Sequence, residues 1–252
     1  MYSTRVNGET LQFGTSGLLY RSNKLMYDRG TNTLWNQFIG EPAVGALVGS
    51  GIKLELLPVA VTTWGEWVKA HPDTTVLDIE TGIYPPNSYQ PEWQPGSIYY
   101  DYRTRADTMF PVWQQSDAVC TKGQVLGLKI NGETRAYPLQ VFQRTPVING
   151  SLGGENLVVV SDDAGGARAY QRGPDQFSID NNGDDNAGDD NAGDQAGIAF
   201  LITQAGVRWR VTEEALVQVN KPSMRLSRIP SHNAYWFGWY AFYPDSDVYR
   251  EN

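Results

Sequence analysis

The sequence has few of the side chains that most often carry covalent or metal chemistry: one cysteine, Cys120, and two histidines, His71 and His232, among 252 residues. A single cysteine excludes an internal disulfide and any zinc site that needs several thiolates of this chain. The two histidines lie far apart in the sequence and form no recognisable nucleophile–base motif.

Long apolar runs are missing as well. No stretch of 18 apolar residues is present, so the sequence predicts no membrane-spanning helix. The first residues do not show the basic and then apolar pattern of a secretion signal, so we expect no signal peptide in this chain.

Basic residues are too few and too scattered to form a surface for nucleic acid. The chain has 20 Lys and Arg against 28 Asp and Glu, and its formal net charge is −8. Most of that charge lies in residues 180–194, which contain no Lys or Arg, so the rest of the chain is close to neutral. Because a phosphate backbone is bound by a basic stripe, we expect no nucleic-acid partner.

Turn-forming residues are abundant, with 26 Gly and 14 Pro spread between short apolar runs. Asn7-Gly8 and Asn131-Gly132 each interrupt an alternating pattern, which predicts two hairpins with type I′ turns. Residues 157–160 form a continuous apolar run that is typical of a fully buried strand. The sequence therefore predicts a mainly β fold with a few short helices.

Two segments, residues 64–76 and 236–248, match each other without a gap and share paired tryptophans and a proline. This likeness predicts a tandem duplication of one unit, built from short antiparallel strands and ending in a short helix anchored by tryptophan. In each helix the aromatic spacing places both tryptophans in the core. The residues that match upstream are Leu54, Leu57 and Pro58 in the first copy and Leu226, Ile229 and Pro230 in the second.

The duplication divides the chain into three parts. Residues 1–82 form the first repeat unit, and residues 120–252 form the second, which carries an acidic low-complexity insertion at 180–197. Residues 83–119 are rich in proline and tyrosine, which predicts an extended connector that lies against the protein.

One polar cluster in the first unit is a candidate ligand site. A neighbouring Asp and Arg with a nearby carboxylate can bind a small polar ligand, and a tryptophan can stack on it. The simpler interpretation is a turn whose Asp serves the backbone. The second unit lacks the Tyr-Asp-Arg motif at the matching place, which favours a function specific to the first unit. The members of the cluster are Tyr27, Asp28, Arg29, Trp35, Gln37 and Glu41.

His71 closes the first tryptophan helix and joins this list. Tyr243 takes its place in the second copy, so a hydrogen-bonding aromatic is enough there, and a structural role is the simpler interpretation. The alternative is a general acid or base.

The acidic insertion is the only candidate for a metal. Carboxylates on a glycine-rich backbone suit calcium, although the spacing does not match an EF-hand loop. A solvated, disordered segment is the simpler interpretation, because so polar a stretch has nothing to bury. The candidate ligands are Asp180, Asp184, Asp185, Asp189, Asp190 and Asp194.

Several motifs together resemble the bacterial and archaeal family catalogued as domain of unknown function 3179, and the resemblance covers almost the whole chain. It brings no activity with it. It implies two full copies, so the first is expected to be truncated at its amino terminus, and the full-length protein is expected outside the cytoplasm. The motifs lie at residues 13–20, 26–29, 34–37, 63–64, 71–72, 125–127, 135–138, 147–149 and 153–154.

Two functional hypotheses follow. The first is a non-enzymatic, extracytoplasmic binding or structural module, whose aromatic surface takes a small polar or carbohydrate ligand. The second is an enzyme, possibly a hydrolase, with a site around Asp28, Arg29, Glu41 and His71. Residues 4–13 are also expected to form an open strand edge through which the chain self-associates.

Overall fold

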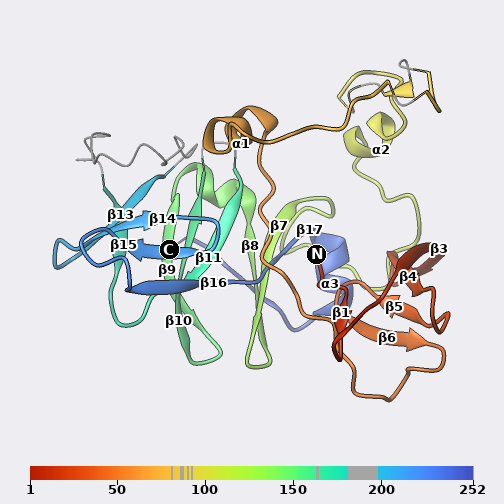
Figure 1. Cartoon of the computed structure of the whole chain (residues 1–252), viewed down its shortest axis with the longest axis horizontal. Coiled ribbons are helices and arrows are strands. Elements are labelled where there is room, and N and C mark those ends of the chain that lie inside the picture. The colour runs from red at the N-terminus through yellow and green to blue at the C-terminus, as the bar shows by residue number, and fades with distance from the viewer. Residues whose placement is uncertain are drawn as a thin grey trace.

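The computed structural model describes residues 1–80, 82–85, 88–89, 91, 93–162, 165–180 and 198–251. The fold is mainly β with a few short helices, as predicted, and its strands form one eight-stranded sheet, two four-stranded sheets and a separate hairpin (Figure 1). Within the described ranges, no helix is both long and apolar enough to cross a membrane.

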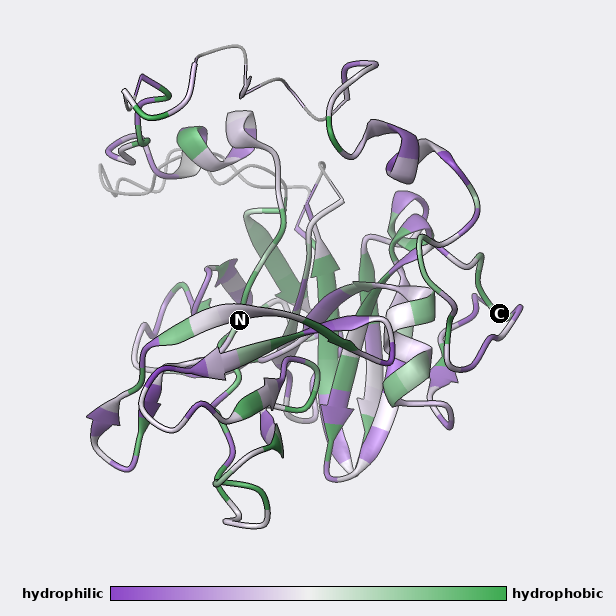
Figure 2. Ribbon diagram, turned by 90° about the vertical axis from the view of Figure 1, so that its right-hand side faces the viewer, coloured by the Kyte–Doolittle hydropathy of each residue, from purple (hydrophilic) through white to green (hydrophobic). Residues whose placement is uncertain are grey.

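The eight-stranded sheet is antiparallel throughout and forms the larger core. The apolar run at residues 157–160 is buried, and its alternate side chains enter two different clusters on the two faces of the sheet. This confirms the predicted strand, because a continuous apolar run needs cover on both faces. Hydrophobic residues concentrate on the strands in the middle of the molecule (Figure 2). In spatial order the strands are β12 (Phe177–Ile179), β13 (Phe200–Thr203), β14 (Arg208–Val211), β15 (Ala215–Gln218), β16 (Arg225–Ile229), β11 (Ala167–Gln171), β10 (Glu155–Ser161) and β9 (Val147–Leu152).

A second sheet packs on the first. Leu126 and Leu128 of this sheet share a buried cluster with Leu157 and Val159 of β10. A short 3-10 helix, η2 (Leu139–Gln143), directly follows the strand of this sheet that ends at Pro138. In spatial order the strands are β17 (His232–Tyr235), β7 (Gln124–Ile130), β8 (Glu133–Pro138) and β18 (Asp247–Val248).

The tips of two hairpins hold these sheets together at one end. Asn131 and Gly132 have φ of 49° and 89°, which confirms the predicted type I′ turn of β7–β8. The Asn131 amide donates to the carbonyl of Gly153 in the β9–β10 turn at 2.8 Å, and the Gly153 N–H donates to Glu133 at 3.0 Å. A Cβ on Gly153 would lie 2.3 Å from the carbonyl oxygen of Ile130, so only glycine lets the tips approach this closely.

The first unit contributes a hairpin and a four-stranded sheet. Strands β1 (Arg5–Val6) and β2 (Glu9–Thr10) pair around Asn7-Gly8, whose φ values of 50° and 87° confirm the other predicted turn. Among the described strands β1 and β2 pair only with each other, and self-association through this region stays a prediction. The sheet consists of β3 (Phe13–Tyr20), β4 (Asn23–Asp28), β5 (Leu34–Asn36) and β6 (Glu41–Val44).

Residues of the predicted first unit, 1–82, contact residues of the predicted second unit, 120–252. Helix α3 (Trp236–Phe242) of the second unit packs on Phe38 of the first, and the Arg21 guanidinium donates to the Ala241 carbonyl at 3.0 Å. Helix α1 (Trp64–Ala70) of the first unit lies over β10, β11 and β14 of the second, where Trp67 lines a small cavity with Arg168. Each unit's helix therefore contacts the other unit's strands.

Residues 83–119 carry helix α2 (Tyr100–Thr104) and leave the body of the molecule before they return to it (Figure 1). Their second half is attached: Ser22 donates to the Pro111 carbonyl at 2.8 Å, and the Trp236 indole donates to the Ser116 carbonyl at 3.0 Å. Trp93, in the first half, is exposed.

Helices α1 and α3 have the same local geometry. Their closing residues, His71 and Tyr243, have φ and ψ of −135° and 69° and of −131° and 68°. The Trp67 indole donates to Thr74 at 3.0 Å, and the Trp239 indole donates to Ser246 at 2.9 Å. The likeness concerns these segments, and the tandem duplication as a whole stays a prediction.

Their surroundings differ. Trp236 and Trp239 are fully buried, whereas Trp64 is 54% exposed and Trp67 is half-buried. The expectation that Trp64 packs inward is therefore wrong. The reason is that α3 lies on β7, with the Trp239 ring against Gly127, while the Trp64 face of α1 is open to solvent.

We expect this difference to appear in stability. Trp239→Ala should lower the free energy of unfolding by about 3–5 kcal/mol, because a large buried aromatic is lost. Trp64→Ala should change it by less than about 1 kcal/mol, because the side chain is already in water. Urea unfolding of both variants checks this, and equal losses would contradict the assignment.

His232 lies where the two units meet. Its ring is stacked on Phe38, with ring centroids 5.5 Å apart, and it also lies near Tyr2 and Trp239. Burial, and to a smaller degree the positive amino terminus, lowers the pKa of His232 to about 4. The imidazole is therefore neutral at pH 7.

This burial predicts a loss of stability in mild acid. As the pH is lowered, the unfolded chain takes up a proton on this histidine near pH 6.5, whereas the folded protein takes it up only near pH 4. The free energy of unfolding should therefore decrease as the pH falls from 6.5 to 4, by up to about 3 kcal/mol. His232→Phe should remove this part of the pH dependence. Urea unfolding from pH 4 to pH 8 measures it, and parallel curves for the two proteins would show that His232 is not responsible.

Candidate functional site

A hollow of about 540 Å³ opens between η2, the start of β7 and the loop after β10. The polar side chains among its lining residues are those of Gln124, Gln140, Gln143, Ser161 and Asp162. Its volume is within the range of small-molecule sites.

The three glutamines are available to a ligand. In the described part of the chain, their carboxamides make no hydrogen bond to protein. Each carboxamide offers two N–H donors and a carbonyl acceptor. Phe142 and Val119 supply the apolar part of the wall.

A second hollow, of about 490 Å³, adjoins the first and shares Gln124, Leu139 and Gly165 with it. It is bordered by residues 61–63, which precede α1, and by residues 233–235 of β17.

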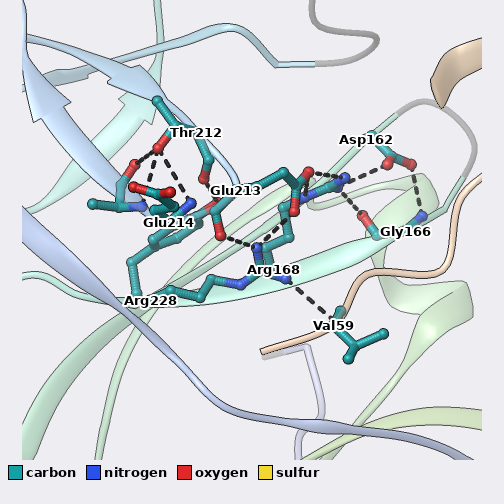
Figure 3. A network of polar contacts seen from close by, with 10 residues as sticks. Val59, Asp162, Gly166, Arg168, Thr212, Glu213, Glu214 and Arg228 are labelled. Carbon is teal, nitrogen blue, oxygen red and sulfur yellow. Dashed lines mark hydrogen bonds and ion pairs between the residues drawn. The ribbon is translucent and has the colours of Figure 1, made fainter. Parts of the chain in front are cut away.

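A chain of alternating charges begins at Asp162, which lines the first hollow, and continues through Arg168, Glu213 and Arg228 (Figure 3). Arg168 of β11 contacts Asp162 at 2.8 Å and Glu213 at 2.6 Å. Arg228 of β16 contacts the other carboxylate oxygen of Glu213 at 2.9 Å. Its guanidinium also donates to the Val59 carbonyl at 3.3 Å, which fixes the segment leading into α1.

The charges of this network balance. Burial alone raises the pKa of Glu213, but the hydrogen bonds and charges of Arg168 and Arg228 outweigh it, so the pKa lies below its ordinary value. Asp162 is fully used: one carboxylate oxygen accepts from the Gly166 N–H at 2.7 Å, and the other pairs with Arg168. The network shapes the wall and leaves no charge free for chemistry.

Helix α1 covers a small cavity of about 30 Å³ beside this network, which is room for about one water molecule. Glu66, Trp67 and His71 line it from the helix side. The His71 ring lies 4.1 Å from the Trp67 ring, centroid to centroid, and within the described residues its imidazole makes no hydrogen bond.

The predicted cluster in the first unit is divided. Asp28 is fully buried and accepts hydrogen bonds from the Thr31 N–H at 2.6 Å, the Thr31 hydroxyl at 2.7 Å and the Trp35 indole at 3.0 Å. Burial by itself raises the pKa of Asp28. The hydrogen bonds lower it by more than burial raises it, so the pKa lies below its ordinary value and the carboxylate is ionised at pH 7. The geometry is that of a turn closed by its own aspartate.

The other members of the cluster lie apart from this carboxylate. The Arg29 guanidinium lies over the Tyr27 ring, 5.5 Å from its centroid, and Glu41 pairs with Lys53 at 3.1 Å. Gln37 is half-buried after β5. His71 follows α1, at a different end of the molecule from β4–β6 (Figure 1). The structure thus brings together Asp28 and Trp35 but not the proposed set of Asp28, Arg29, Glu41 and His71.

The candidate calcium ligands are only partly described. Asp180 pairs with Arg208 at 2.6 Å. Among the described residues, no group of three or more His, Cys, Asp or Glu could hold a metal ion. The remaining candidates lie outside the described residues: Asp184, Asp185, Asp189, Asp190 and Asp194.

Sequence reasoning missed both the hollow and the charge network. One signal was present in the sequence. Arg168 stands between Ala167 and Ala169, and Arg228 directly precedes Ile229, so both arginines occur beside apolar residues. A charge that is buried at such a place needs a partner. Their shared partner, Glu213, is distant in sequence, so no local pattern connects the three.

The fold and the site define a mainly β protein with a few short helices and a hollow whose lining includes three glutamines. The chain belongs to the family described as protein of unknown function (DUF3179), whose model matches residues 1–246. This confirms the family resemblance and adds no activity. No curated protein and no solved structure was found to match the chain.

The geometry of Asp28 predicts a structural effect of its substitution. Asp28→Asn keeps the shape but removes the charge, so the three hydrogen bonds weaken and the free energy of unfolding should fall by about 2–3 kcal/mol. Arg29→Ala, one residue along and exposed, should change it by less than about 0.5 kcal/mol. Urea unfolding compares the two, and a stable Asp28→Asn variant would reopen the ligand-binding interpretation.

Proposed function

We propose that the protein is a binding module for a small, neutral, hydroxyl-rich ligand of the size of a mono- or disaccharide, which it takes into the 540 Å³ hollow. The observation that carries the proposal is that Gln124, Gln140 and Gln143 all line this hollow, and that their carboxamides make no hydrogen bond within the part of the chain that the structure describes. Sugar hydroxyls both donate and accept hydrogen bonds, and carboxamides match them in both respects.

The electrostatics of the wall support a neutral ligand. Asp162 is the acid that lines the hollow, and both of its oxygens are engaged by Gly166 and Arg168. Among the described residues that line the hollow none is Lys or Arg, so an anionic ligand would lose hydration there without a countercharge from them.

A binding role is also favoured over an enzyme. Catalysis by a carboxylate needs an acid whose environment leaves it free to exchange protons. The carboxylates of Asp28, Asp162 and Glu213 are each held ionised or fully hydrogen-bonded by their neighbours. The catalytic hypothesis around Asp28, Arg29, Glu41 and His71 therefore gains no support from the geometry.

Calorimetric titration with neutral hexoses and disaccharides tests the proposal. We expect saturable binding by one of these sugars. Gln124→Ala and Gln143→Ala should each weaken it by about tenfold, because each removes hydrogen bonds of about 1.4 kcal/mol in total. Gln12→Ala, at an exposed glutamine outside the hollow, is the matched control and should bind as the parent does.

Uronic acids and sugar phosphates complete the panel. They should bind more weakly than their neutral counterparts, because the described lining of the hollow includes no Lys or Arg to pair with their charge. The proposal fails if no neutral sugar binds at millimolar concentration, or if the two glutamine variants bind as tightly as the parent.

A further inference from the structure

The second hollow, of about 490 Å³, is lined by polar side chains of the same chemical kind as the first. Thr62 lies on the segment before α1, and Asn233 and Tyr235 belong to β17. All three residues are half-buried, and within the described part of the chain their side chains make no hydrogen bond to protein. Like the glutamines of the first hollow, they are neutral and can both donate and accept hydrogen bonds.

The two hollows meet at Gln124, Leu139 and Gly165, which line both of them. Gln124 is the first residue of β7 and is exposed, and its carboxamide is available on the first hollow's side as described above. Leu139 is the first residue of η2 and is half-buried, so it offers some apolar surface at the junction. A ligand that extends from one hollow into the other would therefore remain in contact with protein where they meet.

The second hollow also favours a neutral ligand. Arg103 of α2 is the charged residue in its described lining, and this side chain already makes an interaction of its own. The other described lining residues are uncharged. The ligand chemistry that suits the first hollow, neutral and rich in hydroxyls, therefore suits the second as well.

We propose that the two hollows form one groove, which binds a linear, neutral oligosaccharide. This inference rests on the proposed function and adds the class of ligand, a chain of repeated sugar units. The repetition of one chemistry on both sides of a shared junction points to a repeated unit. Because the volumes are similar, about 540 and 490 Å³, each hollow takes a similar number of units, and Gln124 contacts the units on either side of the junction.

The test is a calorimetric titration of the intact protein with glucose, galactose and mannose, and with linear oligomers of each that contain two, three or four units. For the sugar that binds, we expect the four-unit oligomer to bind about tenfold more tightly than the disaccharide, because the added units form hydrogen bonds in the second hollow. The four-unit oligomer should also slow hydrogen exchange at residues 61–63, which border this hollow, whereas the disaccharide should not.

Variants assign the gain in affinity to the second hollow. Asn233→Ala and Thr62→Ala should each weaken binding of the four-unit oligomer several-fold and leave the disaccharide unaffected, which also shows that the variants are folded. Asn220→Ala, at an exposed asparagine outside both hollows, is the matched control and should bind every length as the parent does. Gln143→Ala, which lines the first hollow and not the second, should weaken binding of every length.

The outcomes separate this inference from the proposed function. Disaccharide binding that Gln143→Ala weakens, with no gain in affinity from longer oligomers, would overturn the inference and leave the proposed function in place. Equal weakening of short and long oligomers by Asn233→Ala and Thr62→Ala would overturn it as well. If no sugar of any length binds, the proposed function fails, and this inference fails with it.

Discussion

The charge network of Asp162, Arg168, Glu213 and Arg228 is the constraint on which the rest of this structure depends. A buried charge costs several kcal/mol unless a counterion and hydrogen bonds accompany it, and removing one partner leaves the next one uncompensated. Here each charge has an opposite neighbour at 2.6–2.9 Å. The network joins the loop after β10, strand β11, the turn before β15 and strand β16, and through the Val59 carbonyl it also holds the segment that leads into α1. The wall of the hollow and the attachment of α1 therefore share one set of interactions.

The contacts between the two predicted units give this network its setting. Helix α3 shares a buried cluster with Phe38 of the first unit, and α1 lies over strands of the second, although the two larger clusters consist of residues of the second unit alone. His232 marks the contact on one side and Arg228 marks it on the other. A ligand in the hollow would contact elements whose positions are fixed by both units.

Local features could be predicted from the sequence, and features that depend on distant segments could not. The two Asn-Gly turns, the buried run at residues 157–160 and the short helix between Thr63 and Pro72 each follow from neighbouring residues alone. The spacing of Trp64 and Trp67 told which face of the helix is apolar but not whether anything covers it. The sequence left two interpretations of Asp28 open, a ligand site and a turn whose aspartate serves the backbone, and its hydrogen-bond partners Thr31 and Trp35 are those of the turn. The hollow was not foreseen, because unpaired glutamines form no sequence pattern.

The joined tips of the β7–β8 and β9–β10 hairpins have a mechanical consequence. The tips lie at one end of two packed sheets, at the bottom of Figure 1, and the hollow lies at the other end, where β7 begins and where β8 and β10 finish. Strands β7, β8 and β10 run from the tips to the hollow, so a displacement of one tip relative to the other would also move residues that line the hollow. The close contact of Gly153 with the carbonyl of Ile130, and the hydrogen bonds between the tips, oppose such a displacement. The two hairpins therefore cannot slide past each other at their tips, while the opposite ends of β7, β8 and β10 lead to residues that line the hollow.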